Sequence, residues 1–225
     1  MKKFTNFLVM TLSLFFLFSN VYSIDMPKVP KVGIGGGGDK ADIDVDALVD
    51  QQSALVGSMA AALSNLLTAN MNFLEAVGKK GEAEKLKKTI DGLKAGKDVE
   101  KDNLEAGFEA ADTSTKTAIG SFESVKLDAE GKAKFAQGIP PYAAGTIDMT
   151  KTGFAAVDTF KSLKGTKDLT ILRKLGKLIF IGKNAPSLIS SFADATKKIK
   201  KFTSSQGIKD DKLLELKPDM FSAPS

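Results

Sequence analysis

The chain has 225 residues, with 32 basic and 27 acidic side chains and a formal net charge of +5. It contains no histidine and no cysteine, which excludes disulfides, thiol nucleophiles, histidine-dependent catalytic pairs and ordinary zinc or haem sites. Hydrophobic residues make up 43% of the chain, which is enough for one domain with a core. We therefore expect a protein that binds no cofactor and no metal.

The first 23 residues have the pattern of a secretory signal peptide. Lys2 and Lys3 precede an apolar run at 7–18, and Val21 and Ser23 occupy the small-residue positions of a cleavage site. We expect cleavage after Ser23 and an exported protein, either periplasmic or secreted from a bacterium. The alternative is an uncleaved membrane anchor, although the apolar run is short for a membrane span.

Residues 24–43 are predicted to form a flexible linker rich in glycine and proline. Within it, Gly33, Gly35 and Gly38 fit the spacing G-x-G-x-x-G of dinucleotide-binding loops. That fingerprint requires a strand before it and a helix starting at its last glycine, whereas a short stretch broken by prolines precedes these glycines. The P-loop pattern also fails, since no Ser or Thr follows Lys40 to bind magnesium. We therefore expect no nucleotide site.

Asp42, Asp44 and Asp46 have the spacing that opens a calcium-binding loop. Such a loop needs glycine at its sixth position and glutamate at its twelfth, where this chain has Ala47 and Ser53. We expect these acidic residues to cap the following helix, because carboxylates stabilise the positive N-terminus of a helix. A weak site for a hard cation is the alternative.

The helical domain is expected at 44–207, followed by a C-terminal tail at 208–225. Its first helix is predicted from Asp44 or Asp46 to Gly78, because apolar residues recur there at spacings near three, four and seven. These residues are Leu48, Leu55, Met59, Leu63, Leu66, Phe73 and Val77. Asparagines and a glutamate interrupt the pattern, which is not typical of a membrane span.

Two shorter helices are predicted next, one over residues 82–95 and one starting near Asp98. A brief helix should then begin at Asp128, a typical N-cap residue. We expect Pro140 and Pro141 to end it and to start the following helix, because proline is tolerated in a first turn but not in a helix interior.

The last third of the chain should contain further helices. The helix after the two prolines should stop at Gly165, and Asp168 should cap the next one. Residues 184–186 (Asn-Ala-Pro) should kink or break that helix. Strand signals are nearly absent. The predicted fold class is therefore all-α: an antiparallel helical bundle of about five to six helices with a flexible Gly/Pro-rich N-terminal segment.

Charge is distributed unevenly along the chain. Residues 24–150 hold 15 lysines and 20 acidic residues, whereas residues 151–225 hold 15 basic and 7 acidic residues. In 168–202 the basic residues flank apolar turns, which is typical of helices that lie on anionic membranes. The alternative is that the apolar face is bundle core and the lysines keep it soluble. The candidate contacts with an anionic surface are Arg173, Lys174, Lys177, Lys197, Lys198, Lys200 and Lys201.

Little in the sequence favours catalysis or nucleic-acid recognition. Ser114 and Lys116 do not share a helix face, whereas Glu105 and Glu109 do, in a pattern more typical of a solvated surface. The basic third contains one arginine, Arg173, and the chain has no tryptophan. Because base readout favours arginine, we expect no specific nucleic-acid binding.

These observations favour an exported, non-catalytic helical-bundle protein with a binding or structural role. Its partner is expected to be another envelope or extracellular protein. The alternative is a membrane-active or lipid-binding protein that uses the basic amphipathic helices at 168–202.

Overall fold

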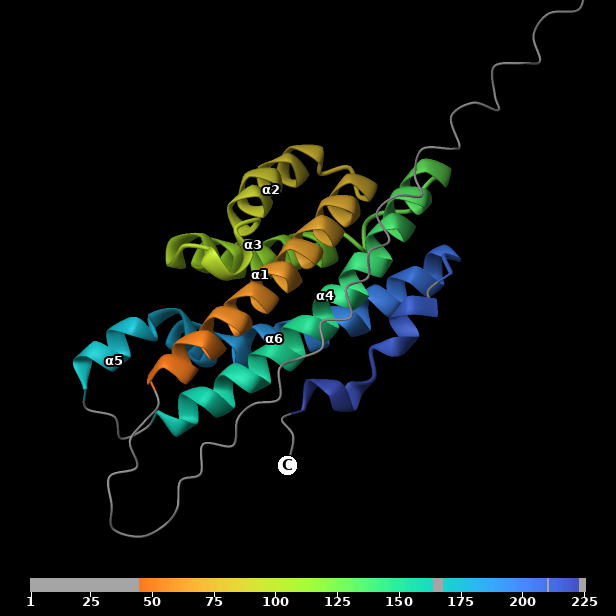
Figure 1. Ribbon diagram of the computed structural model, residues 1–225. Helices are drawn as coiled ribbons and strands as arrows, with labels where there is room; N and C mark the ends of the chain where they lie inside the picture. Colours follow the sequence, from red (N-terminus) through yellow and green to blue (C-terminus); the bar gives the residue numbers. More distant parts are fainter. Residues whose placement is uncertain (1–44, 164–167, 210, 223–225) are drawn as a thin grey trace, which may run out of the picture.

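The computed structural model describes residues 45–163, 168–209 and 211–222, and within these ranges it contains helices and no strand (Figure 1). This confirms the predicted all-α class. The α-helices are α1 (Val45–Ala76), α2 (Lys80–Leu93), α3 (Lys101–Gly120), α4 (Ala129–Ser162), α5 (Leu169–Lys174) and α6 (Gly176–Gln206). Of three short 3-10 helices, η1 (Gly96–Asp98) lies between α2 and α3, and η2 (Asp211–Glu215) and η3 (Pro218–Phe221) follow α6.

The long helices α1, α4 and α6 form the body of the bundle (Figure 1). Glycines of α4 at seven-residue intervals face alanines of α1 at the same interval: Gly131 faces Ala76, Gly138 faces Ala69 and Gly145 faces Ala62. The two numbers of each pair run in opposite directions, so the helices are antiparallel. A Cβ atom at these glycines would lie 3.2, 3.0 and 2.8 Å from the facing alanine oxygens, so α4 approaches the α1 backbone closely.

Aromatic side chains link α4 to its neighbours in the core. Phe73 of α1 stacks on Phe135 of α4 with ring centroids 4.4 Å apart. Tyr142 of α4 is fully buried, and its hydroxyl lies 3.0 Å from Oγ1 of Thr196 in α6. The apolar residues predicted for the first helix are buried from Leu48 through Phe73, which confirms the predicted core face.

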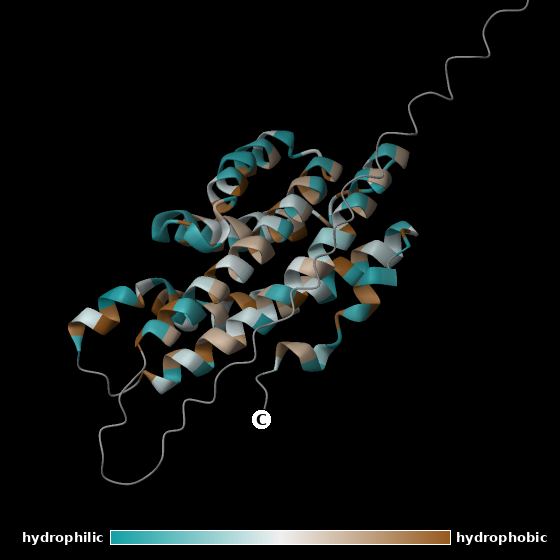
Figure 2. Ribbon diagram, in the orientation of Figure 1, coloured by the Kyte–Doolittle hydropathy of each residue, from teal (hydrophilic) through white to brown (hydrophobic). Residues whose placement is uncertain are grey.

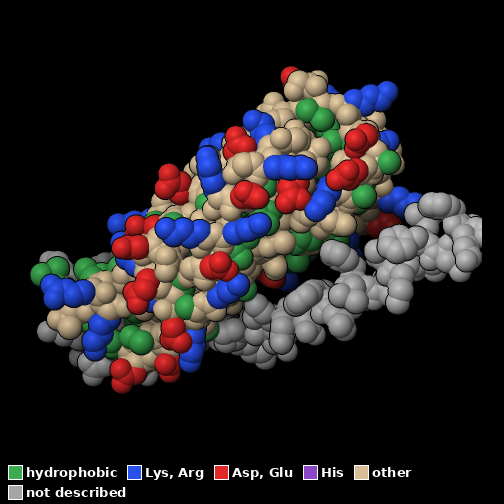
Figure 3. Space-filling model, turned by 90° about the horizontal axis from the view of Figure 1, so that it is seen from above, with side chains coloured by type: hydrophobic (Ala, Val, Ile, Leu, Met, Phe, Trp, Pro, Cys, Tyr) green, Lys and Arg blue, Asp and Glu red, His purple; other side chains and the backbone are tan. Residues whose placement is uncertain are grey.

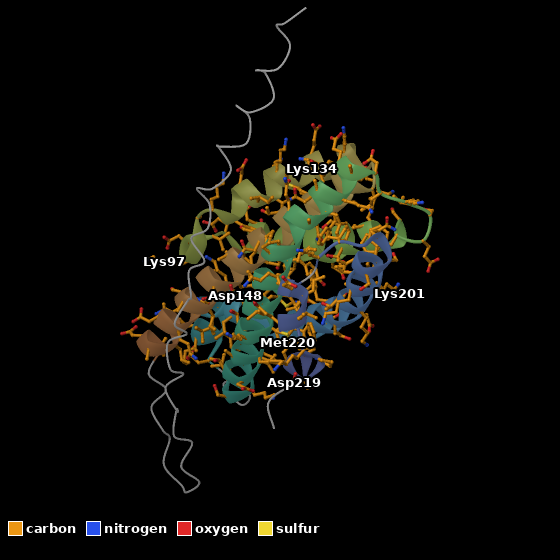
Figure 4. The ribbon with its side chains drawn as sticks, turned by 90° about the vertical axis from the view of Figure 1, so that its right-hand side faces the viewer. Lys97, Lys134, Asp148, Lys201, Asp219 and Met220 are labelled. Carbon is orange, nitrogen blue, oxygen red and sulfur yellow. The ribbon has the colours of Figure 1, made fainter. Side chains whose placement is uncertain are left out.

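Helices α2 and α3 cover one side of α1, and the C-terminal segment covers part of α4 and α6. In that segment Leu213 and Leu216 are buried. The Nζ atom of Lys200 donates to the carbonyl oxygen of Leu216 at 2.8 Å and so connects α6 to it. Figure 4 shows Asp219 and Met220 of η3 at this side of the bundle.

Several predicted helix ends are confirmed. Gly78 follows α1 with a φ of 82°, a conformation that favours glycine. The carboxylate of Asp128 accepts a hydrogen bond from the backbone N–H of Gly131 at 2.8 Å, and that of Asp168 accepts one from Thr170 at 2.8 Å. Both residues are N-caps, as expected. The predicted stop at Gly165 lies outside the described residues.

Two predicted breaks are wrong. Helix α4 continues through Pro140 and Pro141, and α6 continues through Pro186. Pro140 and Pro186 are exposed, so their rings displace no core contact, and packing on both sides of each proline outweighs its low helix propensity. The break in the last third lies instead at Leu175, between α5 and α6.

Helix α1 is long and apolar enough to cross a membrane, by length and composition alone. However, 61% of its most apolar stretch is buried inside the bundle, and the core helix of a soluble protein passes the same test. The predicted signal peptide at 1–23, the linker at 24–43 and the aspartates Asp42 and Asp44 lie outside the described residues.

Candidate functional site

The residues considered for catalysis do not form a site together. Ser114 is buried, where its Oγ donates to the carbonyl oxygen of Ala110 at 2.6 Å and accepts from Nδ2 of Asn70 at 2.7 Å. Lys116 is exposed and forms an ion pair with Asp112. In the part of the chain that the structure describes, no group of three or more Asp or Glu side chains is placed to hold a metal ion.

The candidate basic residues of 168–202 fall into two groups rather than one. The first comprises Arg173, Lys174 and Lys177, and the second comprises Lys197, Lys198, Lys200 and Lys201. Lys177 and Lys197 are separated by about 30 Å along α6, at 1.5 Å per residue. In the second group, Lys197 pairs with Asp194 at 3.0 Å, Lys200 bonds to Leu216, and Lys201 lies at the edge of the bundle (Figure 4).

The apolar residues within and between these two groups, and Phe202 just after them, belong mostly to the core. The buried ones are Leu175, Leu178, Ile181, Leu188, Ile189, Phe192, Ile199 and Phe202. On the face seen in Figure 3, basic and acidic side chains are intermixed rather than gathered by sign. The burial of these apolar residues favours the interpretation that the lysines of α6 surround a core helix.

Two hollows of similar size occur on the described surface. The first, about 420 Å³, lies where the end of α1 meets the starts of α2 and α4. Its carboxylates are partly engaged, since Glu75 forms an ion pair with Lys134 at 2.8 Å and Asp128 caps α4. Because basic and acidic residues are mixed and its lining offers no aromatic side chain, this hollow indicates no particular ligand.

The second hollow, which we call the α3/α6 groove, has a volume of about 400 Å³. It is lined by Glu105, Phe108, Glu109 and Asp112 of α3 and by Phe180, Asn184, Ser187 and Leu188 of α6. The volume is at the lower end of the range of about 300–1,000 Å³ for small-ligand sites. It therefore fits one or two side chains rather than a whole domain.

The floor of the α3/α6 groove is apolar. The rings of Phe108 and Phe180 meet edge to face with centroids 5.1 Å apart, a favourable arrangement for two aromatic rings. Phe108 and Leu188 are buried, whereas Phe180 is half-buried. The groove thus presents mainly the half-buried ring of Phe180, backed by Phe108, to a side chain that enters from solvent.

One wall of the groove is acidic, and no basic residue lines it. Glu105 is paired with Lys101 at 2.7 Å, and this contact raises the pKa of the Lys101 ammonium group. Asp112 is paired with Lys116 and also accepts a hydrogen bond from Ser191 at 2.7 Å. Glu109 is exposed, and no ion pair joins it to a described residue.

This arrangement can bind a positively charged group that is attached to an apolar one. The apolar part would lie on Phe108 and Phe180, and the charge would reach Glu109. The sequence placed Glu105 and Glu109 on one helix face but indicated only a solvated surface. The missing signal was the contact between α3 and α6, which are far apart in the chain. Comparison of the chain with protein-family models, with curated proteins and with solved structures gave no match.

Proposed function

We propose that this chain is an exported, non-catalytic binding protein whose α3/α6 groove holds a segment of a partner protein. In that segment, a lysine or arginine stands next to a large apolar side chain. The observation that carries the proposal is the pairing of an aromatic floor with an acidic wall that no basic residue lines. The predicted signal peptide supports a partner in the cell envelope or outside the cell.

The free energy expected for binding one such segment in the α3/α6 groove is small. Burying one large apolar side chain contributes about 1.5–3 kcal/mol, and an exposed ion pair with Glu109 contributes about 0.2–1 kcal/mol. Their sum of about 2–4 kcal/mol corresponds to millimolar binding or weaker. The groove therefore supplies specificity, and a physiological partner would also contact the neighbouring surface of the bundle.

A labelled peptide tests the proposal. Fluorescence anisotropy would compare a tetrapeptide amide Leu-Lys-Leu-Arg with the neutral analogue Leu-Gln-Leu-Gln. We expect the cationic peptide to bind more tightly, and Glu109→Gln to weaken its binding about two- to fivefold, as expected for one exposed ion pair.

Glu123→Gln provides the matched control, because Glu123 is also an exposed glutamate but does not line the groove. This variant should bind the cationic peptide as the parent does. Equal binding of the two peptides by the parent, or equal losses in the Glu109 and Glu123 variants, would contradict the proposal.

Membrane binding by 168–202 remains the alternative prediction. Since the apolar residues of α6 are mostly buried, the part of this stretch that retains apolar side chains for a lipid surface is α5. Sedimentation of the chain with vesicles that contain anionic lipid tests this alternative.

A further inference from the structure

Helix α5 leaves part of its apolar surface uncovered, although Ile171 packs against the core and Leu172 is half-buried. Three of its six residues are leucine or isoleucine, yet none is buried, and Leu169 is 75% exposed. Arg173 and Lys174 at its end are also exposed. Figure 2 shows the hydrophobic residues of α5 at one end of the molecule. The exposed side of α5, with Leu169, Arg173 and Lys174, is therefore a surface with both apolar and basic character.

The position of α5 is fixed by a buried glutamine. Gln52 of α1 is 8% exposed. Its Nε2 donates to the carbonyl oxygen of Lys174 at 3.0 Å, and its Oε1 accepts from the backbone N–H of Leu178 at 3.1 Å. The amide therefore joins the end of α5 and the start of α6 to α1. Because this junction is fixed, α5 is presented to a partner in a defined orientation.

The chemistry of α5 matches that of the α3/α6 groove. Leu169 lies one turn before Arg173 on the same face of α5, and both are exposed, so α5 offers the apolar side chain and the guanidinium that the aromatic floor and Glu109 would receive. We propose that a second copy of this chain is the occupant of the groove, with α5 of each copy docked in the groove of the other. This inference rests on the proposed function and names its partner.

The positions of the two surfaces allow a closed dimer. The groove begins at Phe180, four residues after α6 starts at Gly176, a distance of about 6 Å along the helix axis. Helix α5 and the groove therefore belong to neighbouring parts of one chain. A twofold axis near this region can bring both pairs together at once, which gives a self-complementary interface rather than an open filament.

Charge favours a second copy over a membrane as the occupant. Glu109, the carboxylate of the groove wall that no described residue pairs, and the two cations at the end of α5 are opposite in charge, so the two surfaces attract each other. Asp46 and Asp50, both exposed, lie on the first turns of α1 at the same end of the bundle as α5 (Figure 1). An anionic lipid surface would repel them. Since each contact is small, we expect a weak dimer with a dissociation constant of about 0.1 mM.

Analytical ultracentrifugation of the exported chain at low salt tests this inference. Between about 5 and 500 µM the parent should pass from monomer to dimer. Arg173→Glu or Glu109→Lys alone should remove the dimer, and the variant carrying both should recover it, because the exchanged charges attract again. Lys198→Glu, an exposed position on the distant part of α6, should dimerise as the parent does. Circular dichroism would verify that each variant is folded.

The outcomes separate this inference from the proposed function. A parent that stays monomeric throughout, or a dimer that neither charge reversal weakens, overturns the inference. If the monomeric parent still binds the cationic tetrapeptide, the groove has another partner and the proposed function stands. If it binds no peptide but sediments with vesicles containing anionic lipid, in a manner that requires Arg173, then α5 contacts membranes and both proposals fall.

Discussion

At Gly145 the absence of a side chain sets the distance between two helices. A Cβ atom there would lie 2.8 Å from the carbonyl oxygen of Ala62 and 2.8 Å from Cγ of Leu66. Real Cβ atoms do not approach backbone oxygen so closely, so α1 and α4 would have to separate. The glycine is therefore required by packing, even though glycine is a weak helix former.

Gly145→Ala should lower the free energy of unfolding by about 1–3 kcal/mol, the usual cost of overpacking a core. Gly81→Ala is the matched control, since it lies in α2 with nothing within 4 Å of the new Cβ atom. That variant should gain up to about 1 kcal/mol from helix propensity. Urea unfolding measures both values, and a change of the same sign in the two variants would contradict this account of the glycine.

Burial also affects an ionisable residue. It raises the pKa of Asp148 on α4, although nearby Lys151 opposes the shift. The folded state therefore holds the proton more tightly than the unfolded chain does. The stability that the protonated Asp148 contributes is therefore fully present when the pH is below the ordinary pKa of 3.8. It is lost as the pH rises through the pKa of the folded state.

Asp148→Asn should consequently raise the melting temperature at pH 7, because the amide carries no charge to desolvate. The advantage should shrink as the pH falls toward 3.8. Asp50→Asn, at an exposed position on α1, serves as the control. Thermal unfolding between pH 3.5 and pH 7 measures the trend, and an advantage independent of pH would contradict it.

Single residues also show where sequence reasoning succeeds. The caps at Asp128 and Asp168 could be predicted because capping is a local interaction, completed within three residues. The close approach at Gly138 and Gly145 could not, because its cause lies on α1 and requires knowledge of which helices pair and in which register.

Helix α6 shows both faces of an amphipathic element. Phe192 is fully buried against Tyr142, with ring centroids 5.9 Å apart, whereas Lys198 points to solvent. Leu188, Phe192 and Ile199 recur at helical spacings of four and seven residues, and all three are buried. The pattern alone could not decide whether the apolar face meets lipid or protein, because the same side chains suit both.

A pair of aspartate substitutions on α6 tests that division. Phe192→Asp should unfold the bundle, because it places an unpaired charge in the core. Lys198→Asp should change the free energy of unfolding by no more than about 0.5 kcal/mol, as is usual for surface positions. Circular dichroism with urea unfolding measures both. A folded Phe192 variant would show that this face of α6 is not core.

The prolines that were wrongly predicted to end helices also show the effect of packing on a whole helix. Pro140, Pro141 and Pro186 are strong local signals for a helix end, yet both helices continue through them. Each helix is long and packs along its length, with buried residues before and after the prolines. Tertiary contacts therefore outweighed propensity, and no local pattern reveals such contacts.

For the molecule as a whole, the all-α class follows from composition and helical periodicity, and the structure confirms it. The α3/α6 groove does not follow from them. Its acidic wall and part of its aromatic floor come from residues 105–112, and the rest comes from residues 180–188. Each half is unremarkable in sequence, and only the packing of α3 on α6 unites charge and aromatic surface.

The most direct test of the groove as a binding site is an NMR titration of the ¹⁵N-labelled chain with N-acetyl-leucyl-arginine amide. The account predicts that the largest amide shifts occur at Phe108, Glu109, Phe180 and Asn184, and that Glu109→Gln reduces them. Shifts centred on the other hollow, around Glu75 and Lys134, or spread evenly over the surface, would contradict it.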